Sequence, residues 1–263
     1  MNIYVLVKQV PATDKVKIDE TTGTMKREEV EAVINPLDLY AIEGALRIRE
    51  IYNDSHITAV SMGPSKAEEV LKEAISMGCD HGILLSDRAF AGADTWATSY
   101  TIASLIKKLG DFSLIITGEK ATDGETGQVG PSLAGQLNLP AVTYVGSIVE
   151  VRDDYIVVER EIEYGTEVVR VKLPAVISVV KAIGEPRLPT LRGKIRARET
   201  RIDVYNLESL GLNREEVGLS GSPTRVVKVF YPRISREGRK VKTSTPDEAV
   251  NNIIQFLEIR GIL

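Results

Sequence analysis

The stretch that decides the fold is Leu114-Ile115-Ile116-Thr117-Gly118-Glu119-Lys120-Ala121-Thr122-Asp123-Gly124-Glu125-Thr126-Gly127-Gln128-Val129-Gly130-Pro131. Its first four residues form an apolar run typical of a buried strand, and a segment punctuated by glycines then leads to a short helix after Pro131. Open α/β sheets bind nucleotides where the carboxyl end of a parallel strand turns into a helix. The stretch therefore predicts a parallel sheet with a ligand site at its edge.

Three more apolar runs precede segments with helical spacing, and this alternation predicts a mainly parallel sheet wrapped by helices: Ile3–Val7, Ile57–Met62 and Gly82–Leu85. The first helix is predicted to start at Asn35-Pro36-Leu37-Asp38, with Asn35 as its cap, and to bury a stripe of Ala41, Ile42, Ala45 and Leu46. A capping box, Ser65 with Glu68, predicts a second helix. A third is expected from near Asp94 to Leu109, ended by Gly110.

Beyond Pro140 the pattern changes to strands that we expect to extend the sheet in antiparallel fashion: Val142–Val151, Tyr155–Ile162, Thr166–Leu173 and Ala175–Val180. Residues 16–28 read as a hairpin at the sheet edge. The predicted fold is a doubly wound, Rossmann-like α/β sheet with an antiparallel extension. We expect residues 1–200 to form this nucleotide-binding domain and residues 201–263 to form a C-terminal arm.

The arm ends in a predicted helix that starts at Thr245-Pro246-Asp247-Glu248 and stops at Gly261. Its apolar residues, among them Ile253, Phe256 and Leu257, lie on one face. The helix can fold back on its own domain, or it can pack on another chain.

Composition excludes several classes of site. The formal net charge of −4 offers no general attraction for nucleic acid, and Cys79, the only cysteine, excludes a disulfide within the chain or an all-cysteine metal site. With only two histidines, a multi-histidine metal site or a histidine-based triad is not expected. No apolar stretch is long enough to cross a membrane, and the start of the chain lacks the pattern of a signal peptide, so we expect a cytoplasmic protein.

The glycine segment has the chemistry of an anion site. Backbone N–H groups at its glycines and at the helix start can cradle phosphate oxygens, and Thr126 and Gln128 can add side-chain donors. The segment is neither a Walker loop nor a GxGxxG fingerprint, and a tight strand-to-helix connection explains the glycines equally well. Asn35–Asp38 and Met62-Gly63-Pro64 are expected at the same sheet edge, where Leu6 and Met62 would pack on an adenine.

A second segment of interest is Gly184-Glu185-Pro186-Arg187-Leu188-Pro189-Thr190-Leu191-Arg192-Gly193-Lys194-Ile195-Arg196-Ala197-Arg198. Two prolines stiffen it, and basic residues surround two leucines. It is either a solvated basic loop or a protein-docking loop with an apolar anchor inside a charged rim.

Six blocks of the chain, taken in order and spacing, resemble the beta subunits of electron-transfer flavoproteins: Val7-Lys8-Gln9-Val10, Asn35–Asp38, Met62–Pro64, Gly118–Pro131, Val158–Ile162 running on to Lys172–Val176, and Glu185–Leu191. The resemblance implies an alpha-subunit partner that carries its own FAD and is embraced by the C-terminal arm. It implies partner docking through Leu191, Arg187 and Arg192. It also implies a nucleotide site at Leu6, Asn35, Pro36, Leu37, Asp38, Met62, Gly118, Ala121, Asp123, Gly124, Glu125, Thr126, Gly127, Gln128 and Val129.

Within that family, conventional members bind AMP as a structural cofactor, whereas electron-bifurcating members bind a second FAD. Residues Asp123–Pro131 resemble the bifurcating pattern, with Glu125 and Gly127 as departures where Asp and Ala are more frequent. The resemblance implies that NADH reduces this FAD, which sends one electron to ferredoxin and one to the alpha-subunit FAD. An acyl-CoA dehydrogenase or a quinone-reductase-like flavoprotein is the further partner that it implies.

Two other hypotheses remain. One is the conventional carrier with AMP, which passes electrons from dehydrogenases to a quinone reductase. The other, from a different class, is a stand-alone regulatory protein that binds an adenine nucleotide; it accounts for the pocket but not for the basic segment or the long arm.

Overall fold

The computed structural model describes residues 1–12, 32–227 and 240–263. The chain forms two compact units, Met1–Val227 and Lys228–Leu263. The predicted hairpin over residues 16–28 lies outside the described residues, as does most of the basic stretch that precedes the last helix.

The first unit is built on a nine-stranded sheet with the order β11-β5-β4-β1-β6-β10-β7-β8-β9. Every neighbouring pair from β11 to β7 is parallel, and β8 and β9 continue the sheet as antiparallel strands. The parallel strands are Asn2–Leu6 (β1), His56–Met62 (β4), His81–Leu85 (β5), Leu114–Gly118 (β6), Ala141–Val151 (β7), Ala175–Val179 (β10) and Asp203–Tyr205 (β11). The antiparallel strands are Tyr155–Ile162 (β8) and Gly165–Lys172 (β9).

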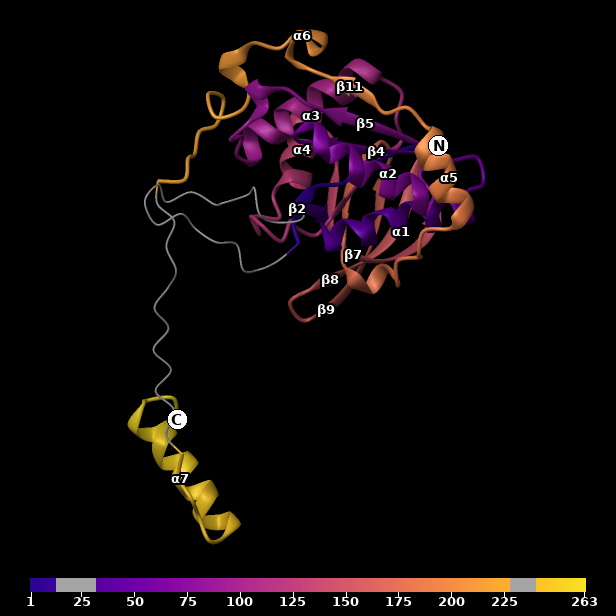
Figure 1. The fold of residues 1–263 in the computed structure, drawn as a ribbon. Helices are drawn as coiled ribbons and strands as arrows, with labels where there is room; N and C mark the ends of the chain where they lie inside the picture. The colour runs from indigo at the N-terminus through magenta and orange to yellow at the C-terminus, as the bar shows by residue number, and fades with distance from the viewer. Residues whose placement is uncertain (13–31, 228–239) are drawn as a thin grey trace. The chain divides into compact units, whose positions relative to one another are not determined.

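Helices cover both faces of this sheet, so the predicted doubly wound α/β fold is confirmed (Figure 1). Helices α1 (Pro36–Ile51) and α2 (Glu68–Met77) pack on one face, and α3 (Thr95–Leu109) and α4 (Val129–Leu137) pack on the other. The stripe predicted for the first helix is buried, with Ala41, Ile42, Ala45 and Leu46 at most 1% exposed. Burial of aliphatic side chains on each face is the main stabilisation of such a three-layer core.

The ends of the helices match the sequence only in part. Asp94 caps α3 by accepting a hydrogen bond from the backbone N–H of Ala97, and Gly110 follows its last residue, as predicted. The capping box at Ser65 is wrong, because Ser65–Ala67 forms a 3₁₀ turn (η2) and α2 begins at Glu68 without a side-chain cap. Helix α4 begins at Val129, two residues before Pro131, which a first helical turn tolerates.

Two strands of the C-terminal half differ from the predicted antiparallel extension, because β7 and β10 pair with each other as parallel strands. β10 is not part of an antiparallel extension: it lies between β6 and β7 and is parallel to both. The extension consists of β8 and β9, which pair with each other and, through β8, with β7. A separate antiparallel pair, Gln9–Pro11 (β2) and Ala32–Ile34 (β3), joins the end of β1 to the start of α1.

The segment Gly184–Arg198 is not a loop throughout. After the 3₁₀ turn Lys181–Ile183 (η4), residues 184–190 form neither helix nor strand, and Leu191–Glu199 form helix α5. Thr190 caps this helix, since its hydroxyl accepts from the N–H of Gly193 at 2.9 Å.

Residues 201–227 belong to the first unit. β11 pairs with β5, Val217 is fully buried, and the hydroxyl of Thr224 donates to Asp94 at 2.8 Å. The short helices α6 (Leu207–Leu210) and η5 (Arg214–Glu216) lie in this stretch, and η3 (Arg88–Phe90) follows β5. The first compact unit therefore extends to Val227.

The second unit contains helix α7, Pro246–Ile259, at the predicted place. Thr245 caps it by accepting from the N–H of Glu248, and the Glu248 carboxylate accepts from the N–H of Ser244 at 2.9 Å. No residue of α7 is buried, and Ile253 and Phe256 are 59% and 47% exposed. Among the described residues, no helix combines the length and apolarity that a membrane span requires.

Candidate functional site

The glycine segment lies at the point where the sheet reverses its strand order. β1 stands between β4 and β6, and the helices that follow β1 and β6, α1 and α4, cover opposite faces. The connections therefore diverge above the carboxyl ends of β1 and β6, which is the usual ligand crevice of an open α/β sheet. The structure brings Lys8, Asn35–Asp38 and Gly118–Val129 together at this edge.

Gly118 is required by a close approach between β6 and the start of α1. A Cβ at this position would lie 2.5 Å from Asp38 Oδ1 and 2.7 Å from the carbonyl oxygen of Leu37. Any side chain would push the two elements apart, because real Cβ atoms do not approach other heavy atoms below about 3 Å.

Asn35 connects three elements at this edge. It occupies the cap position of α1, but its side chain makes no cap hydrogen bond, which corrects the prediction. Instead, Asn35 Nδ2 donates to the carbonyl of Lys120 at 2.9 Å, and Oδ1 accepts from the N–H of Thr122 at 3.2 Å. Its own N–H donates to the carbonyl of Lys8 at 2.8 Å. The fully buried amide therefore holds the glycine segment against the end of β1.

Asp38 lies beneath the segment, only 7% exposed. Its Oδ2 accepts a hydrogen bond from the backbone N–H of Lys8 at 2.8 Å. Burial raises the pKa of Asp38 to about 7, although hydrogen bonds from Asn35 and Lys8 oppose the shift. Asp38 thus fixes the backbone beside the crevice and stays protonated over part of the physiological pH range.

Two lysines pair with two of the three carboxylates of the glycine segment, Asp123 and Glu125. Lys8 Nζ lies 2.7 and 2.8 Å from the two oxygens of Asp123, and Lys120 Nζ lies 3.8 Å from Glu125 Oε1. Without these partners, both carboxylates would repel an anionic ligand. Sequence reasoning missed Lys8 as a site residue, although a lysine that directly follows a buried strand at the ligand edge was a usable signal.

The segment offers a row of unused donors. The backbone N–H groups of residues 126–130 donate to no acceptor within the part of the chain that the structure describes. The α4 cap position, Gln128, makes no side-chain cap bond, and the backbone reaches it through positive φ angles of 53° at Glu125 and 60° at Gly127. Free N–H groups at a helix start bind phosphate and other anions well.

The remaining predicted residues surround this row. Leu6 is buried and Met62 is partly exposed at the ends of β1 and β4. Thr126 and Gln128 are exposed, and Ala121 and Val129 are half-buried. Their contact with a nucleotide stays a prediction. Leu191, Arg187 and Arg192 are elsewhere, in the segment that runs along α1 and the end of α2.

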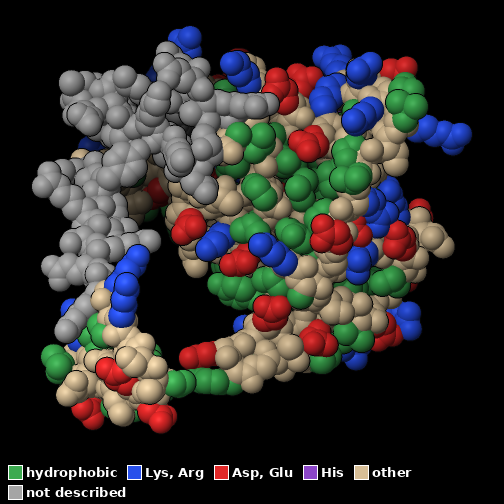
Figure 2. Space-filling view, turned by 60° about the horizontal axis from the view of Figure 1, so that its bottom comes forward, with side chains coloured by type: hydrophobic (Ala, Val, Ile, Leu, Met, Phe, Trp, Pro, Cys, Tyr) green, Lys and Arg blue, Asp and Glu red, His purple; other side chains and the backbone are tan. Residues whose placement is uncertain are grey.

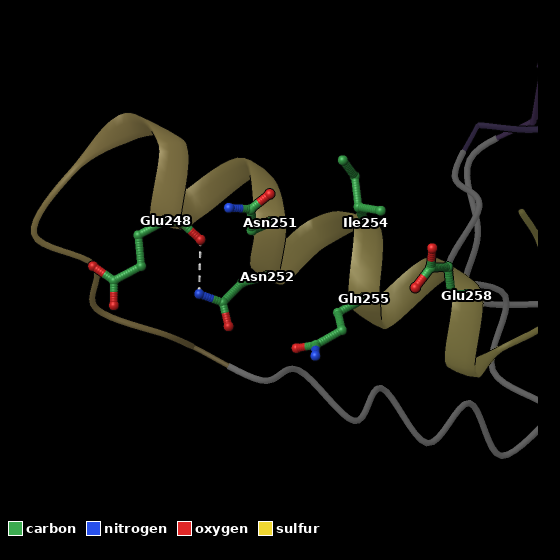
Figure 3. A pocket seen from close by; sticks show the side chains of 6 residues that line it. All are labelled: Glu248, Asn251, Asn252, Ile254, Gln255 and Glu258. Atoms are coloured by element: carbon green, nitrogen blue, oxygen red, sulfur yellow. Dashed lines mark hydrogen bonds between the residues drawn. The ribbon is translucent and has the colours of Figure 1, made fainter.

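Two hollows are lined by residues outside the glycine segment. One is lined by side chains of α7 alone, Glu248, Asn251, Asn252, Ile254, Gln255 and Glu258, which spread along a single helix and cannot enclose a ligand (Figure 3). The other is an open depression at the amino ends of β1, β4, β5 and β11, where His81 Nε2 lies 2.9 Å from Asp203 Oδ2. Over the described ranges, no group of three or more His, Cys, Asp or Glu side chains is arranged to hold a metal ion.

Comparison with known proteins gives consistent matches. The model of a family described as "Electron transfer flavoprotein domain" matches residues 22–210. The chain is 42% identical to "Electron transfer flavoprotein subunit beta" of Thermoanaerobacterium thermosaccharolyticum and to "Caffeyl-CoA reductase-Etf complex subunit CarD" of Acetobacterium woodii, with full coverage of both proteins in each case. It is 37% identical to "Protein FixA" of Sinorhizobium fredii, over 98% of this chain and 92% of that protein.

Proposed function

Since the chain belongs to the electron transfer flavoprotein family, among relatives named subunit beta, CarD and FixA, we propose that it is a beta subunit that holds FAD on its glycine segment and pairs with an alpha subunit. The hypothesis of a stand-alone regulatory protein gains no support from these relatives, because two of them are named as subunits.

The row of N–H groups at residues 126–130, which find no acceptor among the described residues, carries this proposal. A pyrophosphate needs several donors in a line, together with space for close backbone approach. A side chain added at Gly124 would meet no atom within 4 Å, so the backbone there is open to a ligand. With Asp123 and Glu125 neutralised by Lys8 and Lys120, the residues present fit an anionic dinucleotide.

The proposal of electron bifurcation rests on the resemblance of residues Asp123–Pro131 to the bifurcating pattern and on the small residues in this stretch. It also rests on the names of the relatives. The name of the CarD relative places that protein in a complex with a reductase, and FixA proteins match nearly the whole chain. When bound, FAD would accept two electrons from NADH and pass one to ferredoxin and one to the alpha-subunit FAD. This chain's residues would bind its phosphates, fix the loop through Asn35 and keep the local charge balanced through Lys8.

A conventional carrier with AMP is the second candidate. One observation favours it: the same donors at the start of α4 would hold a single phosphate equally well. In this case the chain would carry electrons only through the FAD of the alpha subunit.

Exposed apolar side chains on the first unit support the proposal that the protein works in a complex. Figure 2 shows hydrophobic side chains gathered in the middle of one face of the first unit, with charged side chains of both signs around them. Val149, Ile162 and Val168 of strands β7 to β9 are exposed apolar residues of this unit. Such areas are typical of protein interfaces. The proposed partners are the alpha subunit, ferredoxin and an acyl-CoA dehydrogenase or quinone-reductase-like flavoprotein, in the cytoplasm.

Anaerobic kinetics with the purified heterodimer test the proposal. We expect NADH to reduce ferredoxin only when a high-potential acceptor flavoprotein is also present, because the two electrons must separate. If NADH reduces neither acceptor while the heterodimer still accepts electrons from an acyl-CoA dehydrogenase, the conventional carrier is the correct function.

A further inference from the structure

The segment from residue 184 to 199 exposes apolar side chains to solvent. This exposure does not contribute to the stability of the fold. Leu188 is 84% exposed and Leu191 is 77% exposed. Two prolines, Pro186 and Pro189, restrict the backbone beside them. Exposed leucines on a stiff segment are expected to have a partner.

A buried carboxylate on α1 holds the start of this segment. Glu43 is 3% exposed, and its Oε2 accepts from the backbone N–H of Arg187 at 3.2 Å and from Arg187 Nε at 2.8 Å. Its Oε1 accepts from Arg187 Nη2 at 3.0 Å and from Arg47 Nε at 3.1 Å. The two carboxylate oxygens thus accept four hydrogen bonds, from the guanidinium and backbone N–H of Arg187 and from the guanidinium of Arg47.

Breaking the contact between Glu43 and Arg187 is energetically unfavourable. Burial alone would raise the pKa of Glu43, but the hydrogen bonds from Arg187 and Arg47 lower it below its ordinary value, so the side chain is a carboxylate. A buried carboxylate without its cation is strongly unfavourable. Glu50, by contrast, binds the same guanidinium at 2.9 Å while its side chain is 61% exposed, so solvent can replace that contact.

The other end of the segment is held independently. The backbone of Gly193 lies against the end of α2, where a Cβ would come within 2.0 Å of the carbonyl oxygen of Ser76. Arg196 Nη2 donates to the carbonyls of Ile75 and Cys79 at 2.9 and 2.8 Å. Leu188 and Leu191 therefore project from a short stretch that is anchored on both sides.

We propose that Glu43 is a positioning residue for partner docking: through Arg187 it fixes the stretch that carries Leu188 and Leu191, so that both enter an apolar socket on a redox-partner flavoprotein. The inference rests on the proposed electron-carrier function. The charges identify the socket's rim, because Arg192, Lys194 and Arg198 are exposed around the leucines and call for Asp or Glu on the partner. Prior anchoring removes the cost of ordering the segment during binding.

The test uses the flavin-loaded heterodimer with an acyl-CoA dehydrogenase as the partner, and compares Glu43→Gln with Glu50→Gln. Both variants remove one negative charge next to Arg187, but only the first loosens the buried contact. We expect Glu43→Gln to raise the KM for the dehydrogenase about tenfold, with kcat and flavin content unchanged. Hydrogen exchange of residues 184–190 should accelerate, and Glu50→Gln should stay within about twofold of the wild-type KM.

A double-mutant cycle with Leu191→Ala shows whether Glu43 acts through the leucine. If it does, Leu191→Ala alone raises KM, and adding Glu43→Gln raises it by much less than the product of the two single effects. Full multiplication, or an unchanged KM in Glu43→Gln, would overturn the positioning role. An unchanged KM in Leu191→Ala would instead show that this segment does not dock the partner, and the inference would fall while the proposed electron-carrier function would stand.

Discussion

Asp38 gives the crevice a pH-dependent stability. Its pKa is raised from 3.8 to about 7, so between these values the folded protein holds a proton that the unfolded chain has lost. Stability must then fall as pH rises through this window, by up to about 1.4 kcal/mol per pH unit. Above pH 7 the group is ionised in both states, and its contribution is constant.

Asp38→Asn should remove this part of the pH dependence. Asparagine keeps an oxygen to accept the Lys8 N–H, but it cannot ionise. Between pH 5 and pH 8, the free energy of unfolding of the variant should rise by about 2 to 3 kcal/mol relative to that of the wild type. Urea titrations of the nucleotide-free heterodimer measure this difference. Parallel pH curves for the two proteins would show that Asp38 is already ionised at pH 5.

Gly124 offers the cleanest way to test the anion site. Gly127 adopts a positive φ, so any side chain there strains the backbone, whereas a Cβ at Gly124 would meet nothing within 4 Å. Gly124→Glu should weaken nucleotide binding about tenfold, because a new negative charge near phosphate costs about 1 to 2 kcal/mol. Gly124→Gln, its neutral control, should bind nearly as well as the wild type. Equal affinities in dialysis experiments would place the phosphates elsewhere.

At the scale of single residues, the sequence pointed to a candidate binding segment but not to the contacts that hold this segment in place. The glycine segment could be identified because its neighbours in the chain define a strand end and a helix start. The bonds from Asn35 to Lys120 and Thr122, and the ion pair from Lys8 to Asp123, join residues about 85 to 115 positions apart. Such pairs depend on which strands lie next to each other, and local patterns do not contain that information.

At the scale of elements, local periodicity predicted most strands and helices close to their observed bounds. β7 and β10 were misjudged because their parallel pairing depends on the place of β10 between β6 and β7, which the local pattern does not contain. α5 was predicted as a loop because its many charged residues give no clear helical pattern. In the structure, Thr190 caps this helix, and the helix packs on α2. In both cases the deciding contacts are tertiary, and they override sequence propensity.

Leu191 is the exposed anchor that we predict for partner docking. It is 77% exposed at the start of α5, so truncation should leave the fold intact. Leu191→Ala should cost about 1 to 3 kcal/mol of docking free energy, seen as slower electron transfer at limiting partner concentration with unchanged bound flavin. Arg192→Gln tests the rim and should lose part of its effect at high salt. Equal transfer rates for Leu191→Ala and wild type would make the segment a solvated surface.

Helix α7 is the element that we predict to pack on the alpha subunit. None of its residues is buried, although Ile253, Phe256 and Leu257 are apolar. Deleting residues 245–263 should abolish co-purification with the alpha subunit, because an isolated amphipathic helix of this length needs a packing partner. Ile253→Asp should weaken the pair, whereas Gln255→Asp, which places the same charge on the opposite side of the helix, should not. An intact heterodimer after the deletion would contradict the prediction.

For the whole molecule, the central proposal is that the glycine segment of this chain binds a full FAD and not only AMP. The most direct measurement is the nucleotide content of the purified heterodimer, obtained by acid extraction, flavin absorbance and chromatography of the released nucleotides. We predict two FAD per heterodimer and no AMP. One FAD together with one AMP, unchanged after incubation with excess FAD, would contradict it.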